Sequence, residues 1–156
     1  METIQGDIFE LIKSKKYDVL IHGCNCFCNM RAGFALYLKK RYPEVLKADQ
    51  GTPIGSANKL GTYSLCKITI HNHEMIVVNA YTQFHWHGEG VLADYDAIRK
   101  VFSSIKQEFH GHHIIYPKIG AGLAKGNWLK IKEIIDEELS GEKHTYVEYK
   151  KGANKY

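Results

Sequence analysis

Apolar residues follow two different periods along this chain. Runs of apolar or alternating β-branched residues are typical of strands, and apolar residues spaced three and four apart are typical of helices. The strands that these patterns predict span residues 1–5, 17–21, 60–70, 75–79, 112–116 and 145–149. The predicted helices span residues 9–12, 33–41, 44–49, 91–109 and 128–139. Strands that alternate with helices, together with one hairpin, predict an α/β protein with a central mixed sheet covered on both faces.

The same pattern indicates a single domain. The chain has 156 residues, which is enough for one compact core, and it contains no internal repeat, low-complexity segment or linker. We expect one domain over residues 1–156, with a core from about 4 to 149 and a loose tail at 150–156.

Composition is that of an ordinary globular protein with a mild positive charge. Hydrophobic residues make up 44% of the chain, charged residues 24%, and the formal net charge is +4. No apolar run is long enough to span a bilayer, and no secretory signal precedes the first strand, so we expect a cytoplasmic protein without membrane contact. The charge suits an anionic partner, although solubility explains it equally well.

Three of the four cysteines, Cys24, Cys26 and Cys28, alternate within one short stretch. A disulfide between residues two apart would be strained, and the spacing differs from that of a zinc knuckle. We therefore expect reduced thiols, no metal site and no cofactor.

Two strand-to-helix connections place small and polar residues where ligands bind in open α/β sheets. The first runs from Leu20 to Ala35, and the second runs from Ile114 to Leu123 and on toward Trp128. Helix N-termini and glycine-rich turns present backbone N–H groups, so the two segments predict a cradle for an anionic ligand. A simple tight turn explains the Gly-x-Gly of the second segment equally well.

The first connection also contains two candidate functional side chains, His22 and Asn25. Histidine at the end of an apolar strand is either a hydrogen-bonded core residue or a catalyst that faces a cleft. Asparagine offers a donor and an acceptor, which suit sugar hydroxyls. A third stretch, from Asn79 to Gly90, is rich in aromatic residues that either stack on a base or pack within the loop.

Taken together, these segments resemble the macro domain family. The matching residues are Gly6-Asp7-Ile8-Phe9, His22-Gly23-Cys24-Asn25, Met30-Arg31-Ala32-Gly33-Phe34-Ala35 and Ile119-Gly120-Ala121-Gly122-Leu123 with Trp128. Their order and spacing match the family from about Ile4 to Val147. The chain is similar to the compact branch of ADP-ribose-1″-phosphate phosphatases and of glycohydrolases that remove terminal ADP-ribose. The resemblance implies a three-layer α/β/α macro domain.

The resemblance also implies a role for each segment. Asp7 and Ile8 would contact adenine. The distal ribose would be held by Asn25, Met30, Arg31, Ala32, Gly33 and Phe34. The diphosphate would be bound by Ile119, Gly120, Ala121, Gly122 and Leu123. A third loop would contain Thr82 and Gln83, in a stretch that is similar to a loop of antitoxins that strip ADP-ribose from DNA.

Two departures from the glycohydrolase pattern bear on the activity. That branch uses a lysine in the third loop and an aspartate after the glycine loop, where this chain has Gln83 and Ala124. Glutamine cannot attack the ribose as an amine does, and alanine cannot transfer a proton. The phosphatase branch has a histidine at the position matched by His22.

The resemblance therefore favours hydrolysis of ADP-ribose-1″-phosphate to ADP-ribose and phosphate. His22 would act as nucleophile or general acid–base, and Asn25 would orient the distal ribose. Two alternatives remain open: a water-based glycohydrolase acting on ADP-ribosylated protein or nucleic acid, and a non-catalytic reader of ADP-ribose. In each case we expect a monomer that binds ADP-ribose or one of its derivatives.

Overall fold

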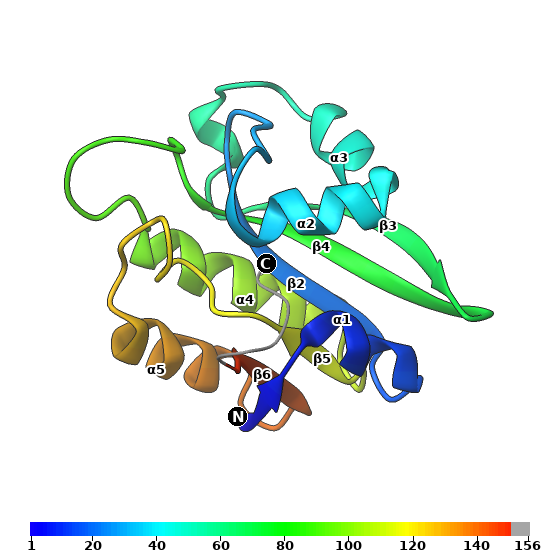
Figure 1. Ribbon diagram of the computed structural model, residues 1–156. Helices are drawn as coiled ribbons and strands as arrows, with labels where there is room; N and C mark the ends of the chain where they lie inside the picture. Colours follow the sequence, from blue (N-terminus) through cyan, green and yellow to red (C-terminus); the bar gives the residue numbers. More distant parts are fainter. Residues whose placement is uncertain (151–156) are drawn as a thin grey trace.

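The computed structural model describes residues 1–150, which fold around one mixed six-stranded sheet (Figure 1). The strands are β1 (Glu2–Gly6), β2 (Val19–Asn25), β3 (Tyr63–Ile70), β4 (His73–Gln83), β5 (Ile114–Tyr116) and β6 (His144–Tyr149). They lie in the order β1-β6-β5-β2-β4-β3. All neighbours are parallel except β3 and β4, which form an antiparallel hairpin. The mixed α/β sheet expected from the sequence is confirmed.

Helices cover both faces of this sheet (Figure 1). They are α1 (Ile8–Leu11), α2 (Gly33–Arg41), α3 (Pro43–Gln50), α4 (Tyr95–Glu108) and α5 (Trp128–Glu138), with 3₁₀ turns η1 (Ile12–Ser14) and η2 (Ala57–Lys59). Helices α4 and α5 pack on one face, and α1, α2 and α3 pack on the other. The result is the expected three-layer α/β/α architecture.

Two apolar clusters, one on each face of the sheet, make up the core. Successive strand residues point to opposite faces, so Val19 joins the cluster under α4 and α5 while Leu20 joins the one under α1 to α3. In β4, Val78 and Val77 divide in the same way. The central strands are buried on both faces, which explains why they are continuous apolar runs in the sequence.

The structure corrects the predicted ends of several elements. Strand β2 continues through His22 to Asn25, and β4 continues to Gln83, where the sequence predicted loops. Thr82 and Gln83 are therefore the last residues of β4 and not part of a loop. The predicted strands were too short because polar residues follow the apolar runs. The ladder between β2 and β4 extends past the apolar runs and pairs His22 with Asn79.

The helix predicted from residue 91 begins later, at Tyr95. Asp94 caps it by accepting a hydrogen bond from the Ala97 N–H, and Ala93 forms a bridge with Gln83 instead of a helical turn. The tail predicted at 150–156 lies, apart from Lys150, outside the described residues. Between residues 1 and 150, no helix combines the length and the apolar character that crossing a membrane requires.

Candidate functional site

A cleft of about 730 Å³ opens at the carboxyl ends of the parallel strands. Its walls come from the end of β2 and the loop that follows, the N-terminus of α2, Gln83 of β4, the segment after β5 and the end of β6. The structure thus brings together the two connections that the sequence singled out. Both reach the same edge of the sheet because parallel strands end side by side there.

The loop after β2 is shaped by the side chain of Asn25. Its Oδ1 accepts hydrogen bonds from the Phe27 N–H at 2.9 Å and the Asn29 N–H at 3.4 Å, and its Nδ2 donates to the Asn29 carbonyl at 2.8 Å. The amide has two donor hydrogens, so one remains for other partners. Asn25 therefore holds the loop in place and still lines the cleft.

The N-terminus of α2 faces the same cleft. Its N-cap residue, Ala32, has no side-chain oxygen, so the N-cap side chain does not cap the helix. Gly33 adopts a φ of 63°, which favours glycine, and a Cβ at this position would lie 3.2 Å from Leu123 Cδ1. The helix start and the loop after β5 therefore meet across the mouth of the cleft.

The loop after β5 depends on backbone geometry. Gly120 has a φ of 69°, and its carbonyl accepts a hydrogen bond from the Gly126 N–H at 2.7 Å. A Cβ on Gly120 would lie 3.2 to 3.3 Å from side chains of Ile131, Ala93 and Ile98. A residue with a side chain would therefore be strained and overpacked at this position.

His22 lies at the floor of the cleft with 1% of its surface exposed. Its Nε2 lies 2.6 Å from Asn79 Oδ1. The orientation of that amide is fixed, because Asn79 Nδ2 donates to the Val45 carbonyl at 3.1 Å and to Ser64 Oγ at 3.1 Å. Since Oδ1 only accepts, Nε2 of His22 holds the proton and donates it to Asn79.

The imidazole of His22 is neutral at physiological pH. Burial lowers its pKa to about 4, and the hydrogen bond to Asn79 only partly opposes this effect. With Nε2 protonated, the lone pair lies on Nδ1; Cys24 Sγ lies 3.7 Å from Nδ1 and 3.5 Å from Nε2. Burial raises the pKa of the Cys24 thiol, so Cys24 remains protonated and can donate to Nδ1. His22 therefore presents one basic nitrogen.

The hydroxyl of Thr82 lies close to this centre. Oγ1 would be 2.9 Å from a Cβ added to Gly23, a residue that lines the cleft. This buried hydroxyl has no hydrogen-bond partner among the described residues. A buried polar group without a partner is costly, but Thr82 is fully buried and does not line the cleft, whereas its neighbour Gln83 does.

Sequence reasoning missed a buried polar group beneath the first loop. Lys59 Nζ donates to the Cys26 carbonyl at 3.2 Å, lies 3.6 Å from Cys28 Sγ and sits 4.5 Å from the centre of the Tyr81 ring. Tyr81 in turn donates to Asp49 Oδ1 at 2.8 Å. A lysine in a loop of Gly, Pro and Ser residues gives no sign of burial, so no sequence pattern could have identified it.

Some residues assigned by resemblance do not line the cleft. Asp7 caps α1 by accepting from the Phe9 N–H at 2.9 Å, and Ile8, the first residue of that helix, is fully buried. Ile119 is buried in the core and Ala121 packs against it, whereas Gly120, Gly122 and Leu123 line the cleft. All six residues assigned to the distal ribose line it: Asn25, Met30, Arg31, Ala32, Gly33 and Phe34.

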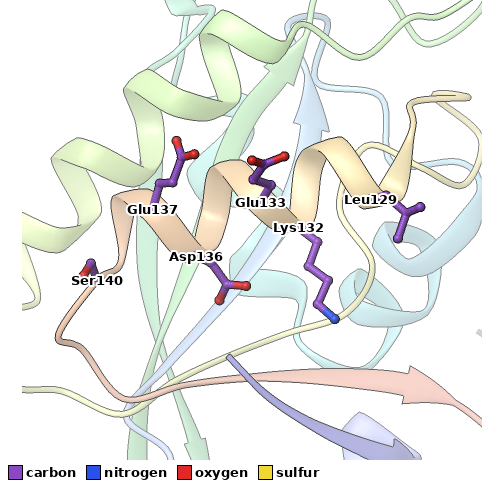
Figure 2. Close-up of a pocket in the computed structure, with 6 residues that line it drawn as sticks. All are labelled: Leu129, Lys132, Glu133, Asp136, Glu137 and Ser140. Carbon is purple, nitrogen blue, oxygen red and sulfur yellow. The ribbon is translucent and has the colours of Figure 1, made fainter.

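Two further features bear on the choice of site. A hollow of about 680 Å³ lies along α5, lined by Leu129, Lys132, Glu133, Asp136, Glu137 and Ser140 (Figure 2). Glu133 and Glu137 point to one side of the helix while Lys132 and Asp136 point to the other, so the charges do not converge (Figure 2). Within residues 1–150, no His, Cys, Asp or Glu residues form a group that could hold a metal ion. The cleft is therefore the candidate site.

Comparisons with known proteins give one sequence relative and several structural neighbours. No family model matches the sequence. The chain is similar to an uncharacterized 17.5 kDa protein in the tk-vs intergenic region of Enterobacteria phage T4, with 37% identity over 142 residues that cover 87% of this chain and 88% of that protein.

Among solved structures, the fold is similar to the macrodomain of DarG from Mycobacterium tuberculosis. The identity is 21%, the TM-score is 0.72, and the match covers 94% of this chain and 97% of that chain. It is also similar to DarTG from Thermosipho africanus, solved in complex with ADP-ribose, with 19% identity and a TM-score of 0.71. That match covers 95% of this chain and 42% of that chain.

Proposed function

This chain belongs to the same family as the phage T4 protein and has the fold of the macrodomains, and from this premise we propose that its cleft binds ADP-ribose or a derivative of it. One structural neighbour was solved in complex with ADP-ribose. The volume of about 730 Å³ is within the range of pockets that hold ligands of this size.

The observation that supports the proposal most directly is the meeting of two loops rich in backbone N–H groups. The uncapped start of α2 and the turn at Gly120 and Gly122 both line the cleft. Backbone N–H groups in such positions bind phosphate oxygens. Among the lining residues, two side chains carry a positive charge, Arg31 and Lys118, and one carries a negative charge, Glu148. This balance favours a diphosphate.

We assign the parts of the ligand along the cleft. The diphosphate lies against Gly120 to Leu123, and the distal ribose lies against Asn25 and residues 30–34. Adenine lies toward Asp7 and Ile8, where a carboxylate can accept from an exocyclic amine. Because Asp7 and Ile8 do not line the cleft, this last assignment requires α1 to present them to a bound ligand.

The experiment for binding is calorimetry with free ADP-ribose. We expect saturable binding to the wild type and to Leu129→Ala, a control in which 77% of the residue is exposed on α5 outside the cleft. Gly120→Ala should weaken binding, because the added Cβ displaces the loop that presents its N–H groups. Equal affinity in Gly120→Ala and Leu129→Ala would contradict the assignment of the diphosphate.

A second, finer proposal is hydrolysis of ADP-ribose-1″-phosphate, and the geometry of His22 favours it. Asn79 fixes the proton on Nε2 and leaves the lone pair on Nδ1, so His22 would take up a proton or attack phosphorus through Nδ1. Gln83 donates to the His85 carbonyl at 2.9 Å, and Ala124 is buried. Neither can replace the lysine and aspartate of the glycohydrolase branch, so removal of ADP-ribose from protein or nucleic acid would require activated water.

Phosphate release separates these activities. Wild type incubated with ADP-ribose-1″-phosphate should release phosphate, and His22→Gln, which keeps an N–H donor for Asn79 and loses the basic nitrogen, should not. Calorimetry on the same samples checks that the variant still has a folded site. Undiminished release by His22→Gln would rule out His22 as the catalyst. No release above a boiled control, with ADP-ribose still bound, would rule out the phosphatase and leave a glycohydrolase or a reader, which a gel of ADP-ribosylated protein and nucleic acid separates.

A further inference from the structure

One surface outside the cleft carries a large share of the positive charge. Residues 8–47 contain eight lysine or arginine residues and three aspartate or glutamate residues, a net charge of +5, whereas the whole chain has a net charge of +4. Six of the eight cations lie on η1, just after it, and in the last turn of α2. We call them the basic face: Lys13, Lys15, Lys16, Lys39, Lys40 and Arg41.

Contacts between α1 and α2 join the two parts of the basic face. Arg41 Cζ lies 4.0 Å from the centre of the Phe9 ring of α1, and Phe9 stacks on Phe34 of α2 with ring centres 5.2 Å apart. Burial raises the pKa of Tyr42, whereas the charges of Arg41 and Lys13 both lower it, so both cations lie near this ring. Both helices pack on the same face of the sheet (Figure 1). The two groups of cations therefore belong to one surface.

Few carboxylates balance the basic face. Lys13 forms an ion pair with Glu10 at 3.0 Å, and the other five cations form no ion pair with any residue from 1 to 150. The other two carboxylates of residues 8–47 are Asp18, which accepts a hydrogen bond from the His113 N–H at 2.7 Å, and Glu44, in the first turn of α3. Like charges that are held together repel one another, and a bound polyanion relieves this repulsion.

The dipole of α2 accounts for only part of this arrangement. Lys39, Lys40 and Arg41 occupy the last turn of α2, where the negative end of the helix dipole stabilises cations. Lys15 and Lys16 follow η1 and lie outside every α-helix of the described chain. The surface therefore gathers cations from two separate segments, which stabilisation of one helix end does not explain.

The composition of the surface indicates the kind of polyanion. The large apolar side chains that are exposed between residues 1 and 150 all lie outside residues 8–47: Ile54, Leu65, Phe84, Trp86, Val91, Leu123 and Leu129. The centre of a protein–protein interface is apolar, whereas contacts to phosphates need only cations and hydrogen-bond donors. Duplex DNA also carries one charge per about 1.7 Å, roughly twice the density of an extended acidic peptide. The basic face therefore suits a nucleic-acid backbone better than an acidic protein.

We propose that the basic face binds the phosphate backbone of a nucleic acid that carries no ADP-ribose, without reading its base sequence. The surface is separate from the cleft, because none of its six cations lines the cleft. Helix α2 has nine residues, so at about 1.5 Å per residue its last turn lies about 13 Å from the helix start at the cleft. The inference does not depend on the proposed ADP-ribose site, and a bound duplex leaves that site open.

The salt dependence of DNA binding tests the proposal, measured by fluorescence anisotropy with a labelled duplex of mixed sequence. If about six phosphates are neutralised, the affinity of wild type should fall about 1,000-fold between about 50 and 200 mM salt. The triple variant Lys15→Gln, Lys16→Gln, Lys40→Gln removes three of these contacts. It should bind more weakly at low salt, and its affinity should fall only about 40-fold over the same range. A duplex of scrambled sequence should bind wild type equally well.

A matched triple variant separates the basic face from the net charge of the chain. Lys67→Gln, Lys100→Gln, Lys143→Gln removes the same charge from exposed positions on β3, on α4 and just before β6. Its affinity for the duplex and its salt dependence should match those of wild type, and the melting temperatures of both triple variants check that they fold. Saturating ADP-ribose should leave the affinity of wild type for the duplex unchanged.

Four results would overturn this proposal and leave the ADP-ribose site untouched. The first is no binding of the duplex at low salt, and the second is an equal loss of affinity in the two triple variants, which would assign the attraction to net charge alone. The third is displacement of the duplex by ADP-ribose, which would place the nucleic acid in the cleft. The fourth is tighter binding of poly-glutamate than of the duplex, which would assign the basic face to an acidic protein. If the duplex binds as expected and ADP-ribose does not bind, the proposed function fails and this inference stands.

Discussion

The two loops that form the cleft are held by opposite means. In the loop after β2, side chains hold the backbone: Asn25 satisfies three backbone groups, and Lys59 donates to the Cys26 carbonyl from below. In the loop after β5, the backbone holds itself through hydrogen bonds from the Gly126 N–H to the Gly120 carbonyl and from the Lys125 N–H to the Gly122 carbonyl.

This difference determines what each loop tolerates. The first loop depends on particular polar side chains, and truncation leaves buried groups without partners. The second loop depends on the absence of side chains at Gly120, where both φ and the surrounding atoms exclude a Cβ. Substitutions that add side-chain atoms should therefore destabilise the second loop, and substitutions that remove side-chain atoms should destabilise the first.

The largest effect is expected for Gly120→Ala. The left-handed φ and the contacts at 3.2 to 3.3 Å should together lower the free energy of unfolding by about 2–5 kcal/mol. Urea unfolding measures this loss. Gly122→Ala is the matched control, because a Cβ there meets no atom within 4 Å, and its midpoint should match that of wild type. Equal losses in both variants would contradict a steric origin at Gly120.

Acid should destabilise the protein through His22. Its pKa is about 4 in the fold and near 6.5 in the unfolded chain, so unfolding takes up a proton between these values. The free energy of unfolding is therefore highest above about pH 6.5. It falls by roughly 3 kcal/mol in total as the pH is lowered toward 4.

Unfolding in urea from pH 8 to pH 4 measures this dependence in wild type and in His22→Gln. The variant should lose less stability on acidification, although His144, whose pKa burial also lowers to about 4, keeps part of the slope. If the unfolding free energies of the two proteins fell equally with pH, burial would not lower the pKa of His22.

Removal of the buried amine tests the support beneath the first loop. Lys59→Met should lower the free energy of unfolding by about 2 kcal/mol, since the Cys26 carbonyl keeps only the Gly55 N–H as donor and Asp49 loses a nearby cation. Lys47→Met, at an exposed position on α3, is the control and should leave the melting temperature unchanged. A melting temperature for Lys59→Met that equals the control would mean that solvent replaces the amine.

The smallest effect is expected for Asn25→Ala, at about 1–2 kcal/mol of unfolding free energy. Asn25→Asp sharpens the result, because it keeps the acceptor for the Phe27 N–H but adds a negative charge to the cleft. We expect the aspartate variant to unfold closer to wild type and to bind ADP-ribose more weakly than the alanine variant. Calorimetry measures the affinities, and the reverse order would remove Asn25 from the ligand site.

Much of the fold could be predicted from the sequence, because buried parallel strands are continuous apolar runs and amphipathic helices repeat their apolar residues. The loops that meet at the cleft could be located for the same reason. The partner of His22 could not, because Asn79 lies on a strand far away in the chain and becomes its neighbour only through the register of β2 and β4. Burial of Lys59 likewise depends on tertiary packing and leaves no local pattern.

The pairing of β1 with β6 has a consequence for biosynthesis. These strands lie at opposite ends of the described chain, and Glu2 pairs with Thr145 in parallel. During synthesis, β1 leaves the ribosome before β6 and cannot pair with it until the chain between them has been made. Because β6 also lines the cleft, a nascent chain cannot complete the site until this last strand has been released.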